Sequence, residues 1–101
     1  MKSPFQADVF AKRFELTLEG GVAGFVEYYD FGDVAIVTHT EIDPAHEGRG
    51  LGSQLARHAL DYLRSERKSV VPVCGFLAHQ MRRHPDFADL LTPECRRIFK
   101  I

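Results

Sequence analysis

The chain has 101 residues, of which 45% are hydrophobic and 27% charged, enough for one modest hydrophobic core. Thirteen basic and fourteen acidic side chains give a formal charge of −1, which excludes the broad positive surface typical of nucleic-acid and anionic-membrane binders. The apolar runs are shorter than the ~20 residues of a bilayer span, the first twelve residues lack a signal-peptide core, and Cys74 and Cys95 are too few for a disulfide framework. We expect residues 1–101 to form one cytoplasmic domain, a monomer or weak dimer.

Three β-rich segments are predicted in the first half of the chain. Residues 13–19 alternate apolar and polar side chains, as a half-buried strand does. A glycine pair then predicts a turn into a second strand over 22–29, in which Gly24 is a candidate bulge. After a turn at 30–33, residues 34–42 are dense in Val, Ile and Thr, as expected for a more central strand. The short connections predict an antiparallel meander.

A helical pattern begins near Leu51, where apolar side chains recur at 3.6-residue spacing to about Lys68. The apolar run 70–74 follows and predicts a short buried strand. Proline cannot donate to a ladder, so Pro72 within this run suggests a bulge, a splayed strand or an unpaired side.

The remaining sequence predicts two short helices. Residues 76–83 are compatible with a helix that Pro85 ends. Residues 86–101 predict another, whose apolar side chains pack on the core. These side chains are Phe87, Leu90, Leu91, Ile98 and Phe99.

Three glycines, Gly48, Gly50 and Gly52, alternate with other residues directly before the first predicted helix. Glycines at a helix N-terminus let an anion approach the free backbone N–H groups, where the helix dipole adds positive charge. A P-loop is excluded because the chain has no Gly-Lys pair, and a dinucleotide fingerprint is excluded because Ser53 and Leu55 stand where its third glycine belongs. The glycines predict either a phosphate or pyrophosphate site or, as the alternative, tight packing of strand against helix.

The segment from Thr40 through this loop resembles motif A of the GNAT superfamily of N-acetyltransferases, Arg/Gln-x-x-Gly-x-Gly/Ala, whose backbone N–H groups hold the pyrophosphate of acetyl-coenzyme A (acetyl-CoA). Gly50 and Gly52 match the two glycines, whereas Glu47 stands at the Arg/Gln position. We expect Glu47 to point to solvent while Arg49 supplies positive charge. The cofactor-binding residues that the resemblance implies are Ile42, Gly48, Arg49, Gly50, Leu51, Gly52 and Ser53.

The resemblance extends over residues 34–90 to a subgroup of GNAT-like proteins of about a hundred residues. Its hallmarks are similar to His39-Thr40-Glu41-Ile42, the glycine loop, Pro72-Val73-Cys74 and Arg83-His84-Pro85. The resemblance implies a minimal GNAT fold of the α+β (α/β-like) class, an antiparallel β-meander followed by β-loop-α-β-α. It also implies that the strands before the loop and after the helix splay apart, with the pantetheine arm of acetyl-CoA between them.

Two side chains are candidate catalytic residues. Cys74 follows the last predicted strand and would act as a nucleophile or as the acid that protonates coenzyme A, unless it is an inert core cysteine. Glu41 lies where many GNAT enzymes place the carboxylate that activates the amine, unless it is a solvated strand charge. No metal is expected, since His79 and His84 are five apart and lack acidic neighbours in metal-ligand spacing.

The sequence thus predicts an acetyl-CoA-dependent N-acetyltransferase. A glycine pair alone joins the first two strands, where larger GNAT enzymes insert two helices that shape the acceptor pocket. The acceptor site should therefore be open, suiting an exposed amine on a larger molecule or a small amine. Two alternatives remain: a non-catalytic acyl-CoA-binding module, and a small interaction domain with no nucleotide ligand.

Overall fold

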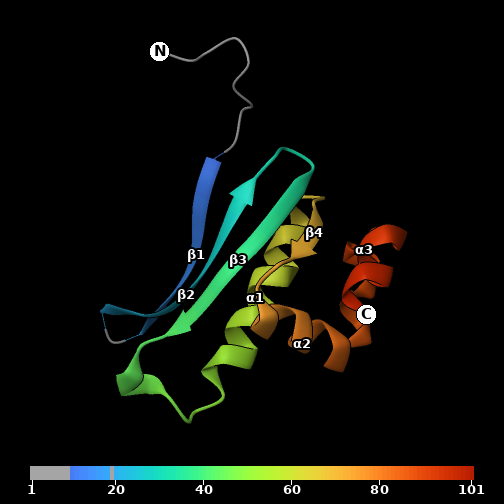
Figure 1. The fold of residues 1–101 in the computed structure, drawn as a ribbon. Coiled ribbons are helices and arrows are strands. Elements are labelled where there is room, and N and C mark those ends of the chain that lie inside the picture. Colours follow the sequence, from blue (N-terminus) through green and yellow to red (C-terminus); the bar gives the residue numbers. More distant parts are fainter. Residues whose placement is uncertain (1–9, 19) are drawn as a thin grey trace, which may run out of the picture.

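The computed structural model describes residues 10–18 and 20–101, and within them the chain forms one four-stranded sheet and three α-helices (Figure 1). The strands are β1 (Phe10–Leu18), β2 (Gly21–Asp30), β3 (Val34–Ile42) and β4 (Ser69–Pro72). The α-helices are α1 (Leu51–Ser65), α2 (Gly75–Arg83) and α3 (Pro93–Phe99), with two short 3-10 helices, η1 (Pro44–His46) and η2 (Pro85–Leu90). Most of the N-terminal stretch from which no signal peptide was expected, residues 1–9, lies outside the described residues.

The sheet is mixed, in the order β1-β2-β3-β4, with the first three strands antiparallel and β4 parallel to β3. This arrangement confirms the predicted meander and the α+β class. One register shift lies beside Leu16 and leaves Ala23 as the extra residue, one position before the predicted bulge at Gly24. Gly24 is required for another reason: a Cβ there would lie 2.8 Å from the backbone oxygen of Glu41, because β2 and β3 approach closely.

The parallel pair β3 and β4 separates halfway along β3. The ladder runs from Val34 and Ser69 to Val37 and Pro72, and there it stops. Proline has no N–H to continue it, and β3 goes on for five more residues without β4 beside it. The chain after β4 turns into α2 instead of extending to residue 74. The splayed pair implied by the resemblance is present, and Pro72 stands at the divergence.

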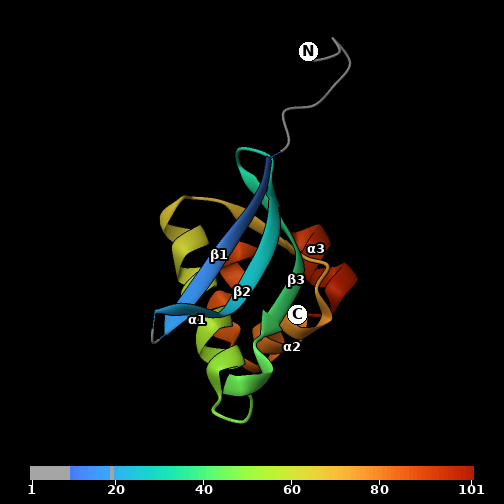
Figure 2. The ribbon, with the colours of Figure 1, turned by 90° about the vertical axis from the view of Figure 1, so that its left-hand side faces the viewer.

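All three helices lie on one side of the sheet, as the two views in Figures 1 and 2 show together. The core forms between this side of the sheet and the helices. Its buried members on α1 are Leu55, Ala56, Ala59, Leu60 and Leu63. On the other side of the sheet, Phe25 and Glu27 alternate with the buried Val26 and are only half-buried, since no described helix covers them.

The C-terminal part differs from the prediction of a single short helix over residues 86–101. Pro85 starts η2, and the chain then makes a separate helix, α3, whose N-terminus is capped by the Thr92 hydroxyl at 3.2 Å from Cys95 N. Phe87, Leu90 and Leu91 are buried as predicted. Ile98 is not: it is 68% exposed, because α3 presents that side to solvent.

An ion cluster fixes the end of the sheet farthest from the glycine loop. Asp30 is buried, and its two carboxylate oxygens contact Lys68 Nζ at 2.8 Å and Lys12 Nζ at 2.9 Å. The hydrogen bonds from Lys68 and Lys12 lower the pKa of Asp30 from 3.8 to about 2. This cluster joins β1, β2 and the turn after α1.

Candidate functional site

The glycine loop connects the end of β3 to α1, five residues beyond the point where β3 and β4 diverge. Asp43 begins it, with its carboxylate accepting a hydrogen bond from Ala45 N at 2.9 Å, and Pro44 starts η1. Gly48 (φ +82°) and Gly50 (φ +69°) adopt the left-handed conformation that only glycine takes without strain. Gly50 is the N-cap of α1, and no side chain caps the helix there. The first N–H groups of α1 therefore have no side-chain acceptor at the cap and are candidate donors for a ligand.

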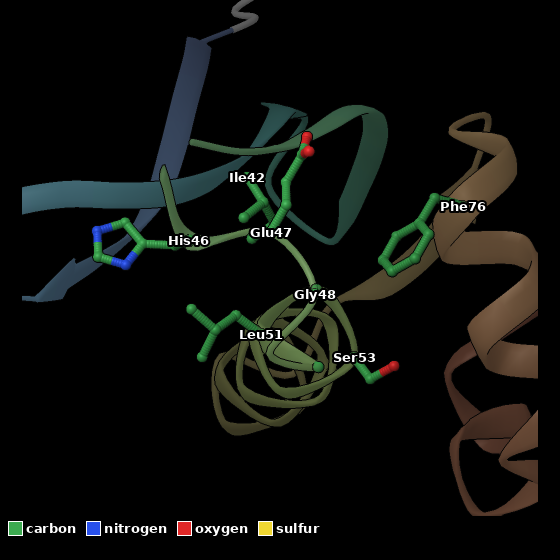
Figure 3. Close-up of a pocket in the computed structure, with 9 residues that line it drawn as sticks. Ile42, His46, Glu47, Gly48, Leu51, Ser53 and Phe76 are labelled. Atoms are coloured by element: carbon green, nitrogen blue, oxygen red, sulfur yellow. The ribbon is translucent and has the colours of Figure 1, made fainter. Parts of the chain in front are cut away.

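These donors border a cavity of about 250 Å³ (Figure 3). Its lining comes from the end of β3, the loop, the first turn of α1 and the start of α2. The lining residues are Ile42, His46, Glu47, Gly48, Gly50, Leu51, Gly52, Ser53 and Phe76. The resemblance implied seven cofactor-binding residues, and the structure brings six of them together here, all but Arg49.

Phe76 forms the wall of this cavity opposite the loop, as the close-up shows (Figure 3). A Cβ on Gly52 would lie 3.0 Å from the ring of Phe76, so the glycine lets the aromatic ring lie against the first turn of α1. The sequence predicts that Phe76 begins a helix but gives no sign that it contributes to the site. The one sequence feature that could have indicated a role is a large apolar residue at the start of a helix, two positions after Cys74. In the structure Phe76 is 40% exposed.

The two charged side chains of the loop, Glu47 and Arg49, differ in their position relative to the cavity. Glu47 is exposed, as expected, but it also lines the cavity. Arg49 is not among the lining residues, and its guanidinium lies 3.4 Å from Nδ1 of His46. The Arg49 side chain thus lies beside a histidine, and Glu47 lines the cavity with its carboxylate pointing away from Gly48 and Ser53 (Figure 3).

Cys74 lies just past the divergence, as the N-cap residue of α2. Its backbone N–H donates to Val37 O at 2.9 Å, the last contact between the two strands. The side chain is 8% exposed, and Sγ lies 3.5 Å from Thr40 Oγ1. A helix N-terminus favours negative charge, so this position suits a sulfur atom that becomes anionic during a reaction.

Glu41 lies on the opposite face of β3 from Cys74. Successive side chains of a strand alternate between faces, and the neighbouring Thr40 points to the thiol. Glu41 pairs in register with Phe25, on the side that no described helix covers. His39 shares that side, with its ring 6.0 Å from the ring of Phe25. The two predicted catalytic residues therefore lie on either side of one strand at its open edge.

The Arg83-His84-Pro85 segment lies away from the cavity and connects α2 to η2. His84 N–H donates to Gln80 O and ends α2, and Nδ1 of His84 lies 3.1 Å from the guanidinium of Arg57 on α1. Arg57 also lies within 3.4 Å of the Asp86 carboxylate. These contacts tie η2 to α1, and they make His84 part of the scaffold.

Among the described residues, no group of three or more His, Cys, Asp and Glu side chains is placed to hold a metal ion. In the same part of the chain, none of the helices is both long and apolar enough to cross a bilayer.

A mixed sheet with diverging parallel strands, and a glycine-rich helix N-terminus at the divergence, define a small acetyltransferase-type fold. The sequence profile of the GCN5-related N-acetyl-transferase family matches residues 13–90, more than half of the chain. The chain belongs to this family. No curated protein matches the chain significantly. Membership in this family suggests a reaction that transfers an acetyl group from acetyl-CoA.

Proposed function

We propose that the chain transfers the acetyl group of acetyl-CoA to an exposed or small amine. The observation that carries this proposal is the uncapped N-terminus of α1, which meets a cavity between the far end of β3 and the start of α2, beyond the point where β3 and β4 diverge. Cys74 and Glu41 are not among the residues that line this cavity. Free N–H groups and the helix dipole suit a pyrophosphate. The open edge of β3, ending at Ile42, suits the amide groups of a pantetheine arm, since those backbone groups have no partner strand on that side.

In the proposed reaction the amine nitrogen, or first Cys74 Sγ, attacks the thioester carbonyl carbon. The new C–N or C–S bond forms, the bond to the sulfur of coenzyme A breaks, and that sulfur leaves as a thiolate that takes up a proton. As the acid, Cys74 gives that proton. As the nucleophile, Cys74 passes its thiol proton to the sulfur of coenzyme A; the amine then attacks the acetyl-Cys74 thioester, the C–N bond forms, the C–S bond to Cys74 breaks, and Sγ regains a proton. Glu41, on the opposite face of β3 from Cys74, accepts the proton that the amine loses through a water at the open edge of the strand.

The open surface around Glu41 supports an acceptor presented from outside. Figures 1 and 2 show the described helices on the other side of the sheet, and Phe25 and His39, next to Glu41 in the register of β2 and β3, lie on the uncovered side. An amine on a larger molecule, or a small amine, reaches such a surface without an enclosing pocket.

The first test is thermal unfolding with and without saturating acetyl-CoA. A ligand at about 100 times its Kd adds about 2.7 kcal/mol, which raises the midpoint of a domain of this size by roughly ten degrees. Gly50→Ala and Gly32→Ala form a matched pair, because both glycines have positive φ and open space at Cβ, but Gly32 lies in the β2–β3 turn far from the cavity.

Both substitutions should destabilise the protein by about 1 kcal/mol through the same backbone strain. Acetyl-CoA should raise the midpoint of the wild type and Gly32→Ala fully and that of Gly50→Ala much less. No midpoint shift in the wild type at millimolar acetyl-CoA would overturn the proposal.

The alternative is a non-catalytic acyl-CoA-binding module, and one observation favours it: Cys74 is almost buried while Glu41 lies on the other face of β3. That alternative predicts the same protection by acetyl-CoA, no acetylation of any amine in a panel, and protection that survives Cys74→Ala.

A further inference from the structure

One side-chain hydrogen bond spans the gap where the ladder between β3 and β4 has ended. The thiol of Cys74 donates to Thr40 Oγ1, with 3.5 Å between sulfur and oxygen. Thr40 belongs to the part of β3 beyond Val37, the last residue paired with β4. The contact thus joins the free half of one strand to the start of the helix that follows the other.

The surroundings of Cys74 make this hydroxyl important. The cysteine belongs to the apolar core cluster and is 8% exposed. An anionic sulfur in such a place needs a hydrogen-bond donor, because burial without a partner is costly. No side chain caps the N-terminus of α2. Among the described residues, the side chain that forms a hydrogen bond with the Cys74 thiol is that of Thr40.

A threonine hydroxyl suits both protonation states of the sulfur, because it rotates and is both a donor and an acceptor. With the neutral thiol it accepts the S–H. After the thiol proton has gone to solvent or to the departing sulfur of coenzyme A, it donates its own O–H to Sγ. The second hydrogen bond is charge-assisted and about twice as strong as the first, so the hydroxyl favours the anionic state.

We infer that Thr40 is a positioning residue, which holds Cys74 Sγ at the divergence of β3 and β4 and supports its anionic form. The inference rests on the proposed function in assigning a reaction to Cys74. It goes beyond that proposal because Thr40 belongs neither to the glycine loop nor to the two candidate catalytic residues, Cys74 and Glu41. Thr40 acts through Cys74 and not on the substrate.

The alternative is that Thr40 only packs. A pair of substitutions separates the two readings: Thr40→Val keeps the shape and loses the hydroxyl, whereas Thr40→Ser keeps the hydroxyl and loses a methyl group. Thr38→Val is the control on the same strand, since Thr38 is exposed and its hydroxyl contacts Glu27 O instead of Cys74. All variants carry Cys95→Ser, so that Cys74 is the single thiol.

The measurement is the rate of alkylation of Cys74 by iodoacetamide from neutral to alkaline pH, with thermal unfolding as the check on folding. Thr40→Val should slow alkylation at neutral pH by about fivefold to tenfold, because the hydrogen bond that the anionic sulfur loses is stronger than the one that the neutral thiol loses, and it should move the rate–pH curve to higher pH. Thr40→Ser and Thr38→Val should stay within about twofold of the parent. A Val variant that reacts like the parent, or a Ser variant as slow as Val, would overturn the inference.

Alkylation needs no acetyl-CoA, so this result is independent of the proposed function. If acetyl-CoA fails to protect the parent protein, the proposed function fails while the alkylation rates still decide the role of Thr40. Protection by acetyl-CoA should be equal in Thr40→Val and the parent. Lost protection together with an unchanged alkylation rate would assign Thr40 to ligand binding and overturn the positioning role.

Discussion

The ring of Phe76 lies 3.0 Å from the point that a Cβ on Gly52 would occupy. One residue is at the start of α2 and the other in the first turn of α1, so this contact sets the distance between the two helix N-termini on either side of the cavity. Glycine at position 52 has a φ in the ordinary helical region, since it is not among the positive-φ glycines. Its small size is needed for the approach of the ring and not for backbone conformation.

Gly52→Ala should therefore change folding and binding in opposite directions. Alanine favours a helix by about 0.5–1 kcal/mol over glycine, which raises the unfolding midpoint by a few degrees. The new methyl group pushes the half-exposed Phe76 ring and covers the N–H groups of the first turn, so acetyl-CoA should bind several-fold more weakly. Thermal unfolding with and without acetyl-CoA measures both effects. Phe76→Leu in the same chain should restore part of the binding, and unchanged affinity in Gly52→Ala would contradict this reading.

Glu47→Gln should tighten the binding of acetyl-CoA. Glu47 lines the cavity, and a carboxylate near a pyrophosphate is repelled by about 1 kcal/mol in a solvent-exposed site. Removing that charge should lower the Kd by about twofold to fivefold at low ionic strength and by less in high salt, where exposed charges are screened. Titration calorimetry at two salt concentrations measures this. Glu94→Gln in α3, away from the cavity, is the control, and an unchanged Kd in Glu47→Gln would show that the carboxylate turns away.

Cys74→Ala should reduce acetyl transfer by roughly 10²- to 10⁴-fold, the usual contribution of an acid or nucleophile, while acetyl-CoA still raises the unfolding midpoint. Cys95→Ala, at a residue in α3 outside the cavity, should keep its activity. Intact mass after incubation with acetyl-CoA and no amine distinguishes the two roles: an acetyl group on Cys74 indicates the nucleophile, and its absence indicates the acid. Turnover close to wild type in Cys74→Ala would make the cysteine a packing residue.

Asp30 should make the protein sensitive to acid. Its pKa is about 2 in the folded chain against 3.8 normally, because Lys68 and Lys12 stabilise the carboxylate. A lowered folded pKa gives stability that is complete above the unfolded pKa and is lost as pH falls through 3.8 toward 2. Asp30→Asn should lower the unfolding midpoint at neutral pH and flatten this acid limb. Asp33→Asn, at an exposed position in the same turn, should leave both unchanged; an equal acid limb in wild type and Asp30→Asn would disprove the assignment.

Much of the fold could be predicted because local patterns and global packing agree. Alternation marked β1, the glycine pair marked the next turn, and the 3.6-residue spacing marked α1, whose apolar face is the one that is buried. The end of β4 and the start of α2 could not be predicted, because they depend on tertiary contacts. The apolar run 70–74 could not show that pairing ends at Pro72 and that Cys74 is already the N-cap residue of α2, because both depend on where β3 runs.

The site was predictable where backbone conformation determines it and not where tertiary contacts do. The glycines of the loop indicated positive φ, and Gly48 and Gly50 have it. The contact of Thr40 with Cys74, and that of Phe76 with Gly52, join residues that are 34 and 24 positions apart, which no local pattern contains. The direction of the Glu47 side chain likewise depends on η1, which precedes it. This 3-10 helix is too short to be predicted from the periodicity of the sequence.

The free half of β3 has a consequence for how occupancy of the site can be observed. From His39 to Ile42 the strand pairs with β2 on one edge, while every second N–H and carbonyl of this segment points to the other edge, where no strand pairs with it. A bound ligand with amide groups would complete this edge as a surrogate strand. The outward amide hydrogens of this segment are therefore a local reporter: they exchange with solvent deuterium quickly in the empty protein and slowly in the occupied one, while the amides bonded to β2 change little.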